Sequence, residues 1–390
     1  MTLPAGTRTA GRAAGLGPSV FAEMTELAVR TGSVNLGQGF PETDGPPAIL
    51  EAARQAVLGG SNQYPPLGGT PRLRRAAAAQ REKRYGTPYD PDTEVVVTSG
   101  ATEAITAAVL ALCGPGEEIV FFDPSYDSYP AAAALAGAVC RRVPLRPSPD
   151  GFSYDPADLR AAVTPATRVL LLNTPHNPTG KVFTHQELAD IADVCVDLDL
   201  VAVVDEVYEY LVYDGLVHRP LASLPGMAER TLTVSSAGKT FSLTGWKVGW
   251  ACGPADLIAA VRSVKQYLTY ATAAPLQDAV ALALESHEPW VTALRHTLSG
   301  NRDTLARALG VAGLEVVPAQ GGYFLQAAVT AGGPDAAAYC RALPYSSGVV
   351  AIPTGAFTDG SGRYGDLVRF SFCKTPGTLA EVAKRLTSRV

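Results

Sequence analysis

Residues 235–250, SSAGKTFSLTGWKVGW, begin with two serines at the end of an apolar run and carry two lysines, Lys239 and Lys247. Loops at the carboxyl edge of an α/β sheet are where such folds bind ligands. Residues 200–210, LVAVVDEVYEY, put Asp205 directly after five apolar residues. A carboxylate in that position is costly to desolvate unless it meets a cation or a strong donor. We therefore expect Asp205 to have a positive partner.

Two further segments have the composition of ligand-binding turns. Residues 173–183, NTPHNPTGKVF, follow another apolar run, and their prolines fix a turn that carries Asn177. Residues 95–105, VVVTSGATEAI, end a strand and open a helix with small residues. Backbone N–H groups at such a helix start, together with the Thr102 hydroxyl, suit a phosphate group. Alone, Lys239 would be a solvated charge and Asn177 a turn residue, but the segments together favour one ligand site.

Other classes of chemistry lack their motifs. The tripeptide GKT at 238–240 resembles the end of a P-loop, but Thr233 stands where that motif needs a glycine, which excludes an ATPase. The five histidines form no HxxxH or His/Cys cluster, so no metal site is predicted. A dinucleotide fingerprint starting at Gly37 would need a third glycine where Glu42 stands, and a GxSxG hydrolase elbow is missing.

Apolar β-branched runs alternate with helical patterns along most of the chain. This alternation predicts an α/β fold whose mostly parallel sheet is covered by helices on both faces. Thr184 and Glu187 have the spacing of a capping box. From about Pro289 the pattern changes to a smaller α+β unit. The expected strands are 95–97, 119–122, 169–172, 200–204, 232–234, 248–252, 314–318, 322–327, 348–353 and 367–373, and the expected helices are 102–112, 185–197, 255–270, 290–309 and one at the C-terminus.

The composition is typical of a globular protein that binds small molecules. The chain has 390 residues, of which 47% are apolar, and a formal net charge of −5, so it has no basic field for nucleic acid or anionic lipid. No apolar run is long enough to cross a bilayer, and the N-terminal residues lack the apolar stretch of a secretory signal. The six cysteines are too widely spaced for a disulfide scaffold. We expect a cytoplasmic protein with reduced thiols.

Together these segments resemble the fold type I pyridoxal 5′-phosphate enzymes of the class I and II aminotransferase family, from about Phe21 to the C-terminus. The variants GQGFP, NQYPP and TGWKVGW are most similar to the branch of kynurenine, glutamine and methionine aminotransferases, and above all to its N-succinyldiaminopimelate aminotransferase-like proteins. The resemblance implies a large cofactor-binding domain, expected at 44–287, and a small domain made of 1–43 and 288–390. The motifs, in the family's order, are NLGQGFP (35–41), NQYPPLGG (62–69), TSGATEAI (98–105), FFDPSYDSYP (121–130), NTPHNPTGKVF (173–183), DEVYEYLVYDG (205–215) and SSAGKTFSLTGWKVGW (235–250).

The resemblance implies roles for five residues around the cofactor ring. Lys239 would form the Schiff base and then carry a proton between the substrate's α-carbon and the cofactor, with burial and nearby cations keeping its amine neutral enough to react. Asp205 would pair with the pyridine nitrogen and keep it protonated, so that the ring can accept electrons. Asn177 and Tyr208 would bond the ring's O3′ oxygen, and Tyr126 would stack on the ring face.

The resemblance also implies how the cofactor's phosphate is held. Lys247 would give a point charge where many relatives have the fork of an arginine. Tyr64 would reach the phosphate of the other subunit, so we expect a homodimer with shared active sites. The remaining phosphate-binding residues would be Gly100, Ala101, Thr102 and Ser236.

Arg369 lies in LVRFSF, an alternating run otherwise nearly free of charge, and an arginine there needs an anion. By the resemblance, Arg369 grips the substrate's α-carboxylate with two parallel hydrogen bonds, and Gly39 and Asn177 line the same pocket. Because Arg369 and Gly39 fall in the small domain and Lys239 in the large one, closure of the domains would complete the pocket and exclude water.

The predicted activity moves an amino group between an L-amino acid and a 2-oxo acid. A lyase, or a carbon–carbon bond-forming enzyme of specialised metabolism, would use the same residues for elimination or replacement at the β- or γ-carbon, and the cofactor motifs do not separate these outcomes. A silent sensor on this fold would need a DNA-binding module, for which the roughly 20 residues before Phe21 give no basic helix. The donor's side chain stays open. Candidate pocket walls are Tyr270, Tyr323, Phe324, Phe357 and residues 16–20.

Overall fold

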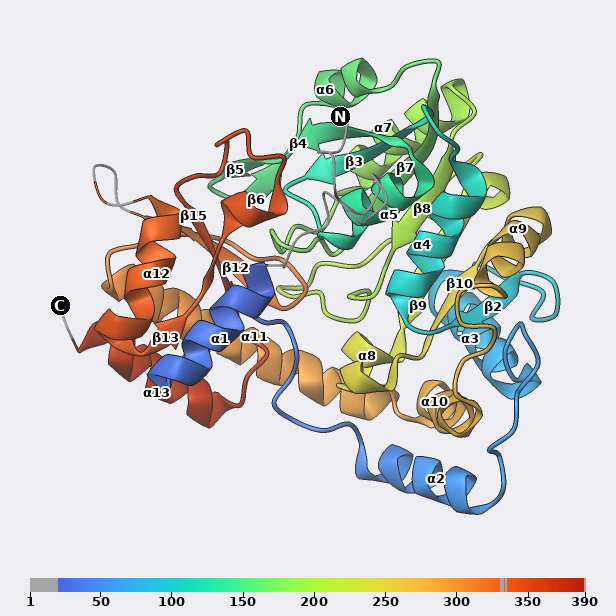
Figure 1. Cartoon of the computed structure of the whole chain (residues 1–390), viewed down its shortest axis with the longest axis horizontal. Helices are drawn as coiled ribbons and strands as arrows, with labels where there is room; N and C mark the ends of the chain where they lie inside the picture. The colour runs from blue at the N-terminus through green and yellow to red at the C-terminus, as the bar shows by residue number, and fades with distance from the viewer. Residues whose placement is uncertain (1–19, 330–332, 334, 389–390) are drawn as a thin grey trace, which may run out of the picture.

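The computed structural model describes residues 20–329, 333 and 335–388, and its centre is a seven-stranded sheet (Figure 1). The strand order is β2-β10-β9-β8-β7-β3-β4. All neighbouring pairs are parallel except those of β10, which runs antiparallel to β2 and β9. The predicted mostly parallel α/β sheet is confirmed. The strands are β2 (Val95–Thr98), β3 (Glu118–Asp123), β4 (Val139–Pro144), β7 (Thr167–Asn173), β8 (Val201–Asp205), β9 (Thr231–Ser236) and β10 (Gly249–Cys252).

The edge strand β4 was not predicted from the sequence. It reads VCRRVP and lacks an apolar run, because an edge strand needs to bury fewer side chains than a central one. Its Arg141 pairs with Glu118 and its Arg142 with Asp123, both on the neighbouring strand β3. Ion pairs between β3 and β4 therefore stabilise this edge of the sheet, as apolar contacts stabilise its centre.

Helices cover both faces of the sheet because its strands are apolar on both sides. In β7, Val169 and Leu171 share a cluster with α4, α5 and α9, whereas Leu170 and Leu172 pack with α6 and α7. The predicted capping box is confirmed: Thr184 Oγ1 accepts from the Glu187 backbone (3.2 Å) and Glu187 Oε2 accepts from that of Thr184 (2.8 Å). The helices of this part are α2 (Pro47–Leu58), α3 (Pro71–Tyr85), α4 (Ala101–Leu112), α5 (Ser128–Ala136), α6 (Pro156–Ala162), α7 (His185–Asp197), α8 (Ala237–Thr240), α9 (Ala255–Lys265) and α10 (Ala274–Ser286).

The prediction was wrong about the end of α9, which stops at Lys265 instead of residue 270. The Lys265 ammonium donates to the Tyr270 carbonyl (2.9 Å), and Tyr270 has a φ of 64°, the left-handed conformation that ends helical runs. The apolar periodicity continues through a turn, so it overstated the helix.

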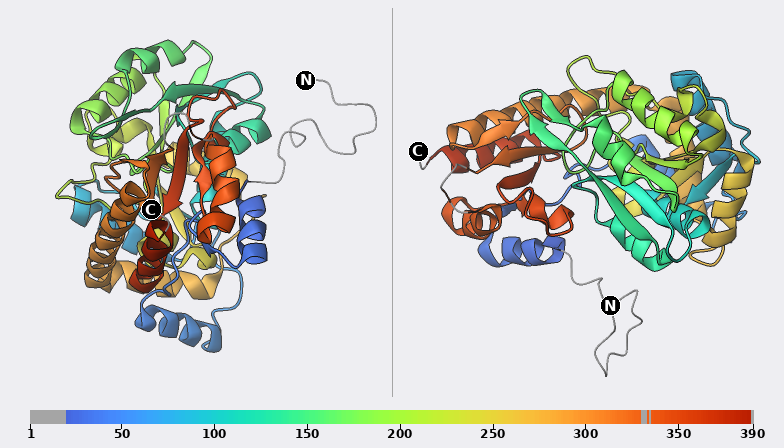
Figure 2. Two further views of the ribbon diagram at one scale, coloured as in Figure 1. Left: turned by 90° about the vertical axis from the view of Figure 1, so that its left-hand side faces the viewer. Right: turned by 90° about the horizontal axis from the view of Figure 1, so that it is seen from above.

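The C-terminal unit contains an antiparallel sheet in the order β11-β12-β15-β14. The single strand predicted at 348–353 is two strands: β13 (Val349–Val350) pairs in parallel with β1 (Val34–Asn35), and β14 (Ile352–Pro353) joins the antiparallel sheet. The N-terminal segment thus packs on the C-terminal unit, with α1 beside α12 (Figures 1 and 2). The domain boundaries stay a prediction. The other elements are α1 (Val20–Thr31), α11 (Glu288–Val311), β11 (Glu315–Val317), β12 (Phe324–Ala328), α12 (Ala336–Ser347), β15 (Leu367–Ser371), α13 (Pro376–Thr387) and the hairpin β5 (Arg146–Ser148) and β6 (Gly151–Ser153).

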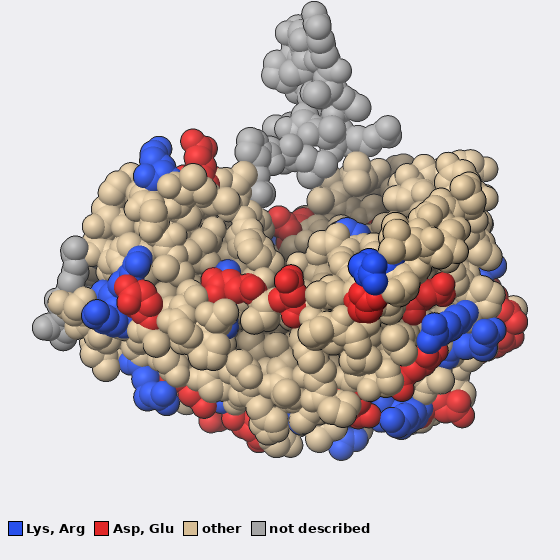
Figure 3. All heavy atoms as spheres, turned by 90° about the horizontal axis from the view of Figure 1, so that it is seen from below, with Lys and Arg blue, Asp and Glu red and all other residues tan. Residues whose placement is uncertain are grey.

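Charged side chains of both signs are interspersed on the face that Figure 3 shows. None of the helices in the described part of the chain is both long and apolar enough to span a membrane. All six cysteines lie among the described residues, and no disulfide joins any of them.

Candidate active site

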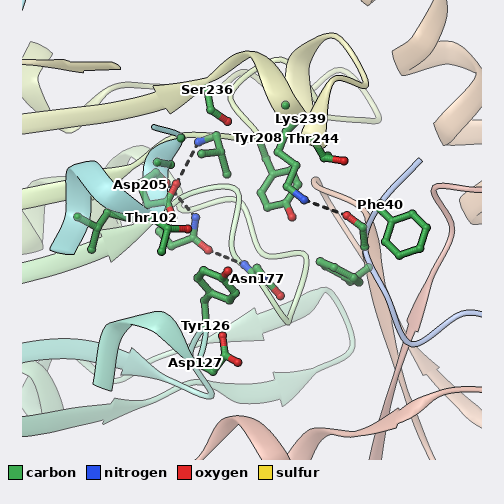
Figure 4. Close-up of a pocket in the computed structure, with 18 of the residues that line it drawn as sticks. Phe40, Thr102, Tyr126, Asp127, Asn177, Asp205, Tyr208, Ser236, Lys239 and Thr244 are labelled. Carbon is green, nitrogen blue, oxygen red and sulfur yellow. Dashed lines mark hydrogen bonds between the residues drawn. The ribbon is translucent and has the colours of Figure 1, made fainter. Parts of the chain in front are cut away.

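A cavity of about 440 Å³ lies between the central sheet and the C-terminal unit (Figure 4). Asn173, Asp205 and Ser236, which end the strands β7, β8 and β9, line one side of it, and Phe324 and Arg369 line the other. Every residue predicted to act in catalysis or to bind the cofactor or the substrate's α-carboxylate lines this cavity, except Tyr64. The carboxyl edge of a mostly parallel sheet is the expected place for such a cavity.

Lys239 lies in the short helix α8, directly after β9, and its side chain points into the cavity (Figure 4). Its Nζ donates to the Gly39 carbonyl (2.9 Å) and lies 5.8 Å and 5.5 Å from the ring centres of Tyr208 and Tyr323. Burial lowers the pKa of the Lys239 amine below its usual value, and Arg369 lowers it further. A lysine with a lowered pKa offers a neutral, nucleophilic amine.

Asp205 ends β8 with a buried side chain. Its carboxylate accepts from the Tyr129 hydroxyl (2.8 Å) and from the Val207 backbone (3.2 Å). Burial nevertheless raises the pKa of this carboxyl to about 6, because these donors offset desolvation only in part. The expected positive partner is not fully supplied by the residues around it, since Lys239 makes only a minor contribution.

The start of α4 has the features of an anion cradle. No side chain caps this helix, and Gly100 at its N-cap has a φ of 79°. A Cβ atom added to Gly100 would lie 2.9 Å from Lys247 Nζ, so the ammonium sits against the glycine backbone. Ala101, Thr102 and Ser236 line the adjoining wall. The positive end of a helix and a lysine side by side favour a bound anion.

Arg369 on β15 is buried and has no carboxylate partner among the described residues. Its Nη1 donates to Asn177 Oδ1 (3.0 Å) and its Nη2 to the Gly37 carbonyl (2.6 Å), whereas no hydrogen-bond partner for its Nε lies in the described part of the chain. The rings of Phe324 and Phe357 lie 3.9 Å and 4.4 Å from its guanidinium carbon. Burial lowers the pKa of Arg369 to about 9. A buried arginine that has no carboxylate partner and whose Nε lacks an acceptor binds an incoming carboxylate strongly.

Asn177, Tyr208 and Tyr126 lie around Lys239 (Figure 4) and line the same cavity as Arg369. The Asn177 backbone donates to Asn173 Oδ1 (2.6 Å), which fixes the proline-bounded turn. Tyr208 is buried, and burial raises the pKa of its hydroxyl well above the usual value, so the group stays a protonated donor.

Gly39 lines the cavity on the segment between β1 and α2. A Cβ atom at this position would lie 2.2 Å from Phe324 Cζ, so only glycine fits. Of the candidate wall residues that the structure describes, Phe324 lines the cavity, whereas Val20, Tyr270, Tyr323 and Phe357 do not. Tyr323 bonds the Lys239 carbonyl (2.7 Å) behind it, and residues 16–19 lie outside the described part of the chain.

Tyr64 lies outside the cavity of its own chain. A tyrosine that binds the cofactor of another subunit is expected to lie there. Its side chain is 84% exposed and makes an edge-to-face contact with Tyr270, whose ring centre is 5.3 Å away. Tyr267 nearby in sequence is 85% exposed. Tyr270 was expected in the cavity wall and belongs instead to this exposed aromatic group, because the turn after α9 carries it outward.

The sequence analysis missed several residues of the cavity. Tyr129, the donor to Asp205, lies in the first turn of α5, three residues after Tyr126, and this spacing was the available signal. Phe21 and Phe40 contribute aromatic rings from the N-terminal segment, and nothing in their local sequence marked them. Asp127 adds a partly buried carboxyl whose pKa burial raises.

Comparisons with known proteins agree on one family. The profile described as aminotransferase class I and II matches residues 31–386. A probable N-succinyldiaminopimelate aminotransferase of Mycobacterium tuberculosis is 54% identical over 95% of this chain and 95% of its own length. Mouse kynurenine–oxoglutarate transaminase 3 is 40% identical over 95% of this chain and 88% of its own. The solved N-succinyldiaminopimelate aminotransferase from Mycobacterium tuberculosis matches with a TM-score of 0.96 over 98% of this chain and 100% of that one.

Proposed function

Since this chain belongs to the class I and II aminotransferases, and is therefore a transaminase, we propose that its cavity holds pyridoxal 5′-phosphate and that Lys239 attaches it. The observation that carries this proposal is the position of the Lys239 amine, with its lowered pKa, in one cavity with the anion cradle at Gly100 and the carboxylate of Asp205. These three features correspond to the aldehyde, phosphate and ring nitrogen of the cofactor.

The polar groups of the cavity fit this cofactor because each lacks something that it supplies. The uncapped start of α4 and Lys247 need an anion, and the positive φ of Gly100 favours a residue without a side chain there. Asp205, with its raised pKa, needs a positive donor, and a protonated ring nitrogen is one. We propose that Ala101, Thr102 and Ser236 complete the phosphate site, that Asn177 and Tyr208 bond the ring oxygen, and that Tyr126 stacks on the ring.

When bound, the cofactor supplies an aldehyde that takes up amino groups and a ring that draws electrons from the substrate's α-carbon. Lys239 would provide the neutral amine that attaches the cofactor. Once the substrate's amino group has taken its place, the same amine would be the base that carries a proton between the substrate's α-carbon and the cofactor. The Gly39 carbonyl holds Lys239 Nζ in place before substrate arrives. Asp205 keeps its charge opposite the ring nitrogen, and Tyr129 orients the Asp205 carboxylate.

Arg369 binds the substrate's α-carboxylate in this proposal. Its Nε, which has no partner among the described residues, and the adjacent Nη provide two parallel donors, and the Phe324 ring packs 3.9 Å from the guanidinium carbon. Gly39 and Asn177 border the same space. Two contacts with one carboxylate fix the α-carbon relative to Lys239, which is the geometric requirement for proton transfer.

We propose N-succinyldiaminopimelate as the first amino donor to test, because the relative with that name shares 54% identity and the kynurenine enzyme 40%. The cavity's described lining has three cations, Lys239, Lys247 and Arg369, and the first two serve the cofactor. A donor with a distal carboxylate would therefore need a cation beyond these three. A screen with N-succinyldiaminopimelate, kynurenine and methionine decides between charged and uncharged side chains, and preference for either of the latter two would contradict this choice.

We also propose a homodimer in which Tyr64 enters the partner's active site. The exposed pair of Tyr64 and Tyr270 supports this, with Tyr267 also exposed three positions before Tyr270, since exposed aromatic rings are enriched at interfaces. Light scattering should give twice the chain mass of 40.6 kDa. A monomer with full activity would contradict the shared site.

Replacement of the attaching lysine tests the function most directly. Lys239→Ala should abolish turnover and the yellow absorbance of the bound cofactor, because no other described lysine side chain except Lys247 reaches the cavity. Lys83→Ala, which changes a 78% exposed lysine on α3, is the matched control and should leave both unchanged. Normal turnover of Lys239→Ala would refute the assignment.

A second measurement separates transamination from elimination. Enzyme incubated with an amino donor and no 2-oxo acid should yield one pyridoxamine phosphate per active site and then stop. Continuous release of a leaving group from the donor would instead identify a lyase.

A further inference from the structure

A second cluster of buried charges lies behind residues 205–210, on the side away from the cavity. Arg81 Nη1 donates to Glu206 Oε2 (2.7 Å) and to Glu209 Oε2 (3.1 Å), and His218 Nε2 lies 3.1 Å from the same oxygen of Glu206. All four side chains are buried, and none of them lines the cavity. The proposed chemistry leaves them without a role.

Residues 205–209 divide between the two sides, with Val207 also on the cavity side. Asp205 and Tyr208 line the cavity, whereas Glu206 and Glu209 meet Arg81 behind it. Asp205 and Tyr208 are thus each directly followed in the chain by a residue of the buried cluster. A shift of the backbone at Glu206 moves the Asp205 carboxylate with it, because the two residues share a peptide unit.

The cluster also reaches the strand that leads to Lys239. Ser235 Oγ donates to Glu209 Oε1 (2.7 Å), and the next residue, Ser236, lines the cavity. Arg81 itself is on α3, in the buried row Leu73, Ala77 and Arg81. One guanidinium therefore ties α3 both to residues 205–210 and, through Glu209, to β9.

Stability alone gives a weak reason for this arrangement. Arg81 Nε and Nη2 and Glu206 Oε1 have no hydrogen-bond partner within the described residues. Buried ion pairs of this kind can usually be replaced by apolar side chains at little or no loss of stability. A metal is not needed either, since the guanidinium already occupies the cation position between the two carboxylates, although Glu206, Glu209 and His218 lie close enough to ligate one.

We propose that Arg81, Glu206 and Glu209 are positioning residues that hold the Asp205 carboxylate, and with it the Tyr208 hydroxyl, in register with the cofactor ring. This inference rests on the proposed function. Groups that must meet a ligand within a few tenths of an ångström need such support, because a misplacement of about 1 Å weakens catalysis by about a hundredfold. The charged cluster gives the segment a single position, where apolar packing would permit several.

The test compares two ligands, pyridoxal 5′-phosphate and its carbocyclic analogue in which a C–H group replaces the ring nitrogen. Only the first has a nitrogen for Asp205 to bond, so the ratio of the two dissociation constants isolates that contact. The ratio of dissociation constants measured for Asp205→Ala is the value expected when the contact with the ring nitrogen is lost. Binding is followed by absorbance and by ligand-induced stabilisation against heat, so that no turnover is required.

Glu206→Gln and Glu209→Gln keep the side-chain volume and remove the charge that holds Arg81. We expect each to move the ratio at least about fivefold toward the value of Asp205→Ala. This is the effect expected when the charged hydrogen bond between Asp205 and the ring nitrogen is misaligned. Arg84→Met is the matched control, because it removes a positive charge from the same helix at a side chain that is 29% exposed and contacts the Tyr210 ring instead. It should keep the wild-type ratio within about twofold.

Equal weakening of both ligands by the two glutamine variants, with the wild-type ratio retained, would overturn the proposal, since the cluster would then support the fold alone. A wild-type ratio in Asp205→Ala would overturn it in a different way, by showing that Asp205 does not meet the ring nitrogen, and the proposed cofactor placement would fail with it. If Glu206→Gln does not fold, Ser235→Ala replaces it. That variant removes one hydrogen bond to Glu209 and should shift the ratio in the same direction by a smaller factor.

Discussion

Asp205 and Glu206 are neighbours in the chain, yet the pKa values of their carboxyl groups shift in opposite directions. Burial raises the pKa of Asp205 to about 6, whereas for Glu206 the effect of burial is outweighed by Arg81 and His218, and the pKa falls to about 2. The two buried arginines differ in the same way. Burial lowers the pKa of Arg369 to about 9, but for Arg81 it is outweighed by the two glutamates, which raise the pKa well above its usual value.

The contrast between the cavity and the cluster behind it shows that burial by itself does not identify a functional charge. In the cluster each charged group has an oppositely charged partner within the chain, so folding alone determines whether it is ionised. In the cavity the charges of Asp205 and Arg369 are incompletely met within the described residues, and we expect a ligand to complete them. Four variants can break or sharpen this comparison.

The largest effect should come from Arg81→Met, which leaves two buried carboxylates without their cation. Loss of one partner of a buried ion pair lowers the free energy of unfolding by about 3–5 kcal/mol. Urea denaturation measures this. The triple variant Arg81→Met, Glu206→Gln, Glu209→Gln should recover most of the loss, and if the single variant is as stable as the wild type, the cluster is not the paired region described.

Arg369→Gln should have the reverse profile. The free energy of unfolding should change by no more than about 1–2 kcal/mol, because only two neutral acceptors lose a donor. The value of kcat/KM for amino acids should fall by about a hundred- to a thousandfold, as loss of a bidentate charged contact does. Steady-state kinetics measure it, with the corresponding amine that lacks the α-carboxylate as control substrate, whose slow turnover should not change.

A smaller effect concerns pH in the cofactor-free protein. The Asp205 carboxyl has an ordinary pKa of 3.8 in the unfolded chain and about 6 in the folded one. Below about pH 4 it is protonated in both states, and as the pH rises toward 6 the unfolded chain loses the proton first. The free energy of unfolding should therefore fall by about 2–3 kcal/mol over this interval.

Asp205→Asn should remove this decrease, and denaturation curves of both proteins between pH 4 and pH 8 check it. Glu206 acts in the other direction and at lower pH: its stabilisation is present above about pH 4.5 and is lost as the pH falls toward 2. The same pH profile in Asp205→Asn as in the wild type would show that Asp205 does not titrate as the cavity requires.

The smallest effect should come from Lys247→Gln. The lysine is exposed at the rim of the cavity and gives a point charge to the anion cradle, so its loss should weaken cofactor binding by about five- to tenfold. Equilibrium dialysis measures the affinity. Lys247→Arg should restore it, and an unchanged affinity in the glutamine variant would place the phosphate elsewhere.

The sequence allowed prediction of those site residues that have a local signal. Asp205 and Lys239 follow apolar strands, and Arg369 interrupts one, so each stood out among its neighbours. The central strands were predictable for the same reason, since burial on both faces demands a continuous apolar run.

Arg81 shows why the rest was not predictable. It lies in PRLRRAAAAQREKRY, where nothing distinguishes it from exposed arginines of the same helix. Its burial depends on Glu206, which is 125 positions away, just as the role of Tyr129 depends on Asp205, 76 positions away. Contacts between residues so far apart in the sequence form only when folding brings the segments together. The same holds for the edge strand β4 and for the division of residues 348–353 between two sheets.

The hydrogen bond from Lys239 to the Gly39 carbonyl connects the reactive amine with a stretch of backbone 200 positions away. Whatever engages that amine competes with this bond, and the segment between β1 and α2 loses one of its attachments. Amide hydrogen exchange in that segment should thus report whether the lysine is free or engaged, and a probe placed there would follow turnover without touching the cavity.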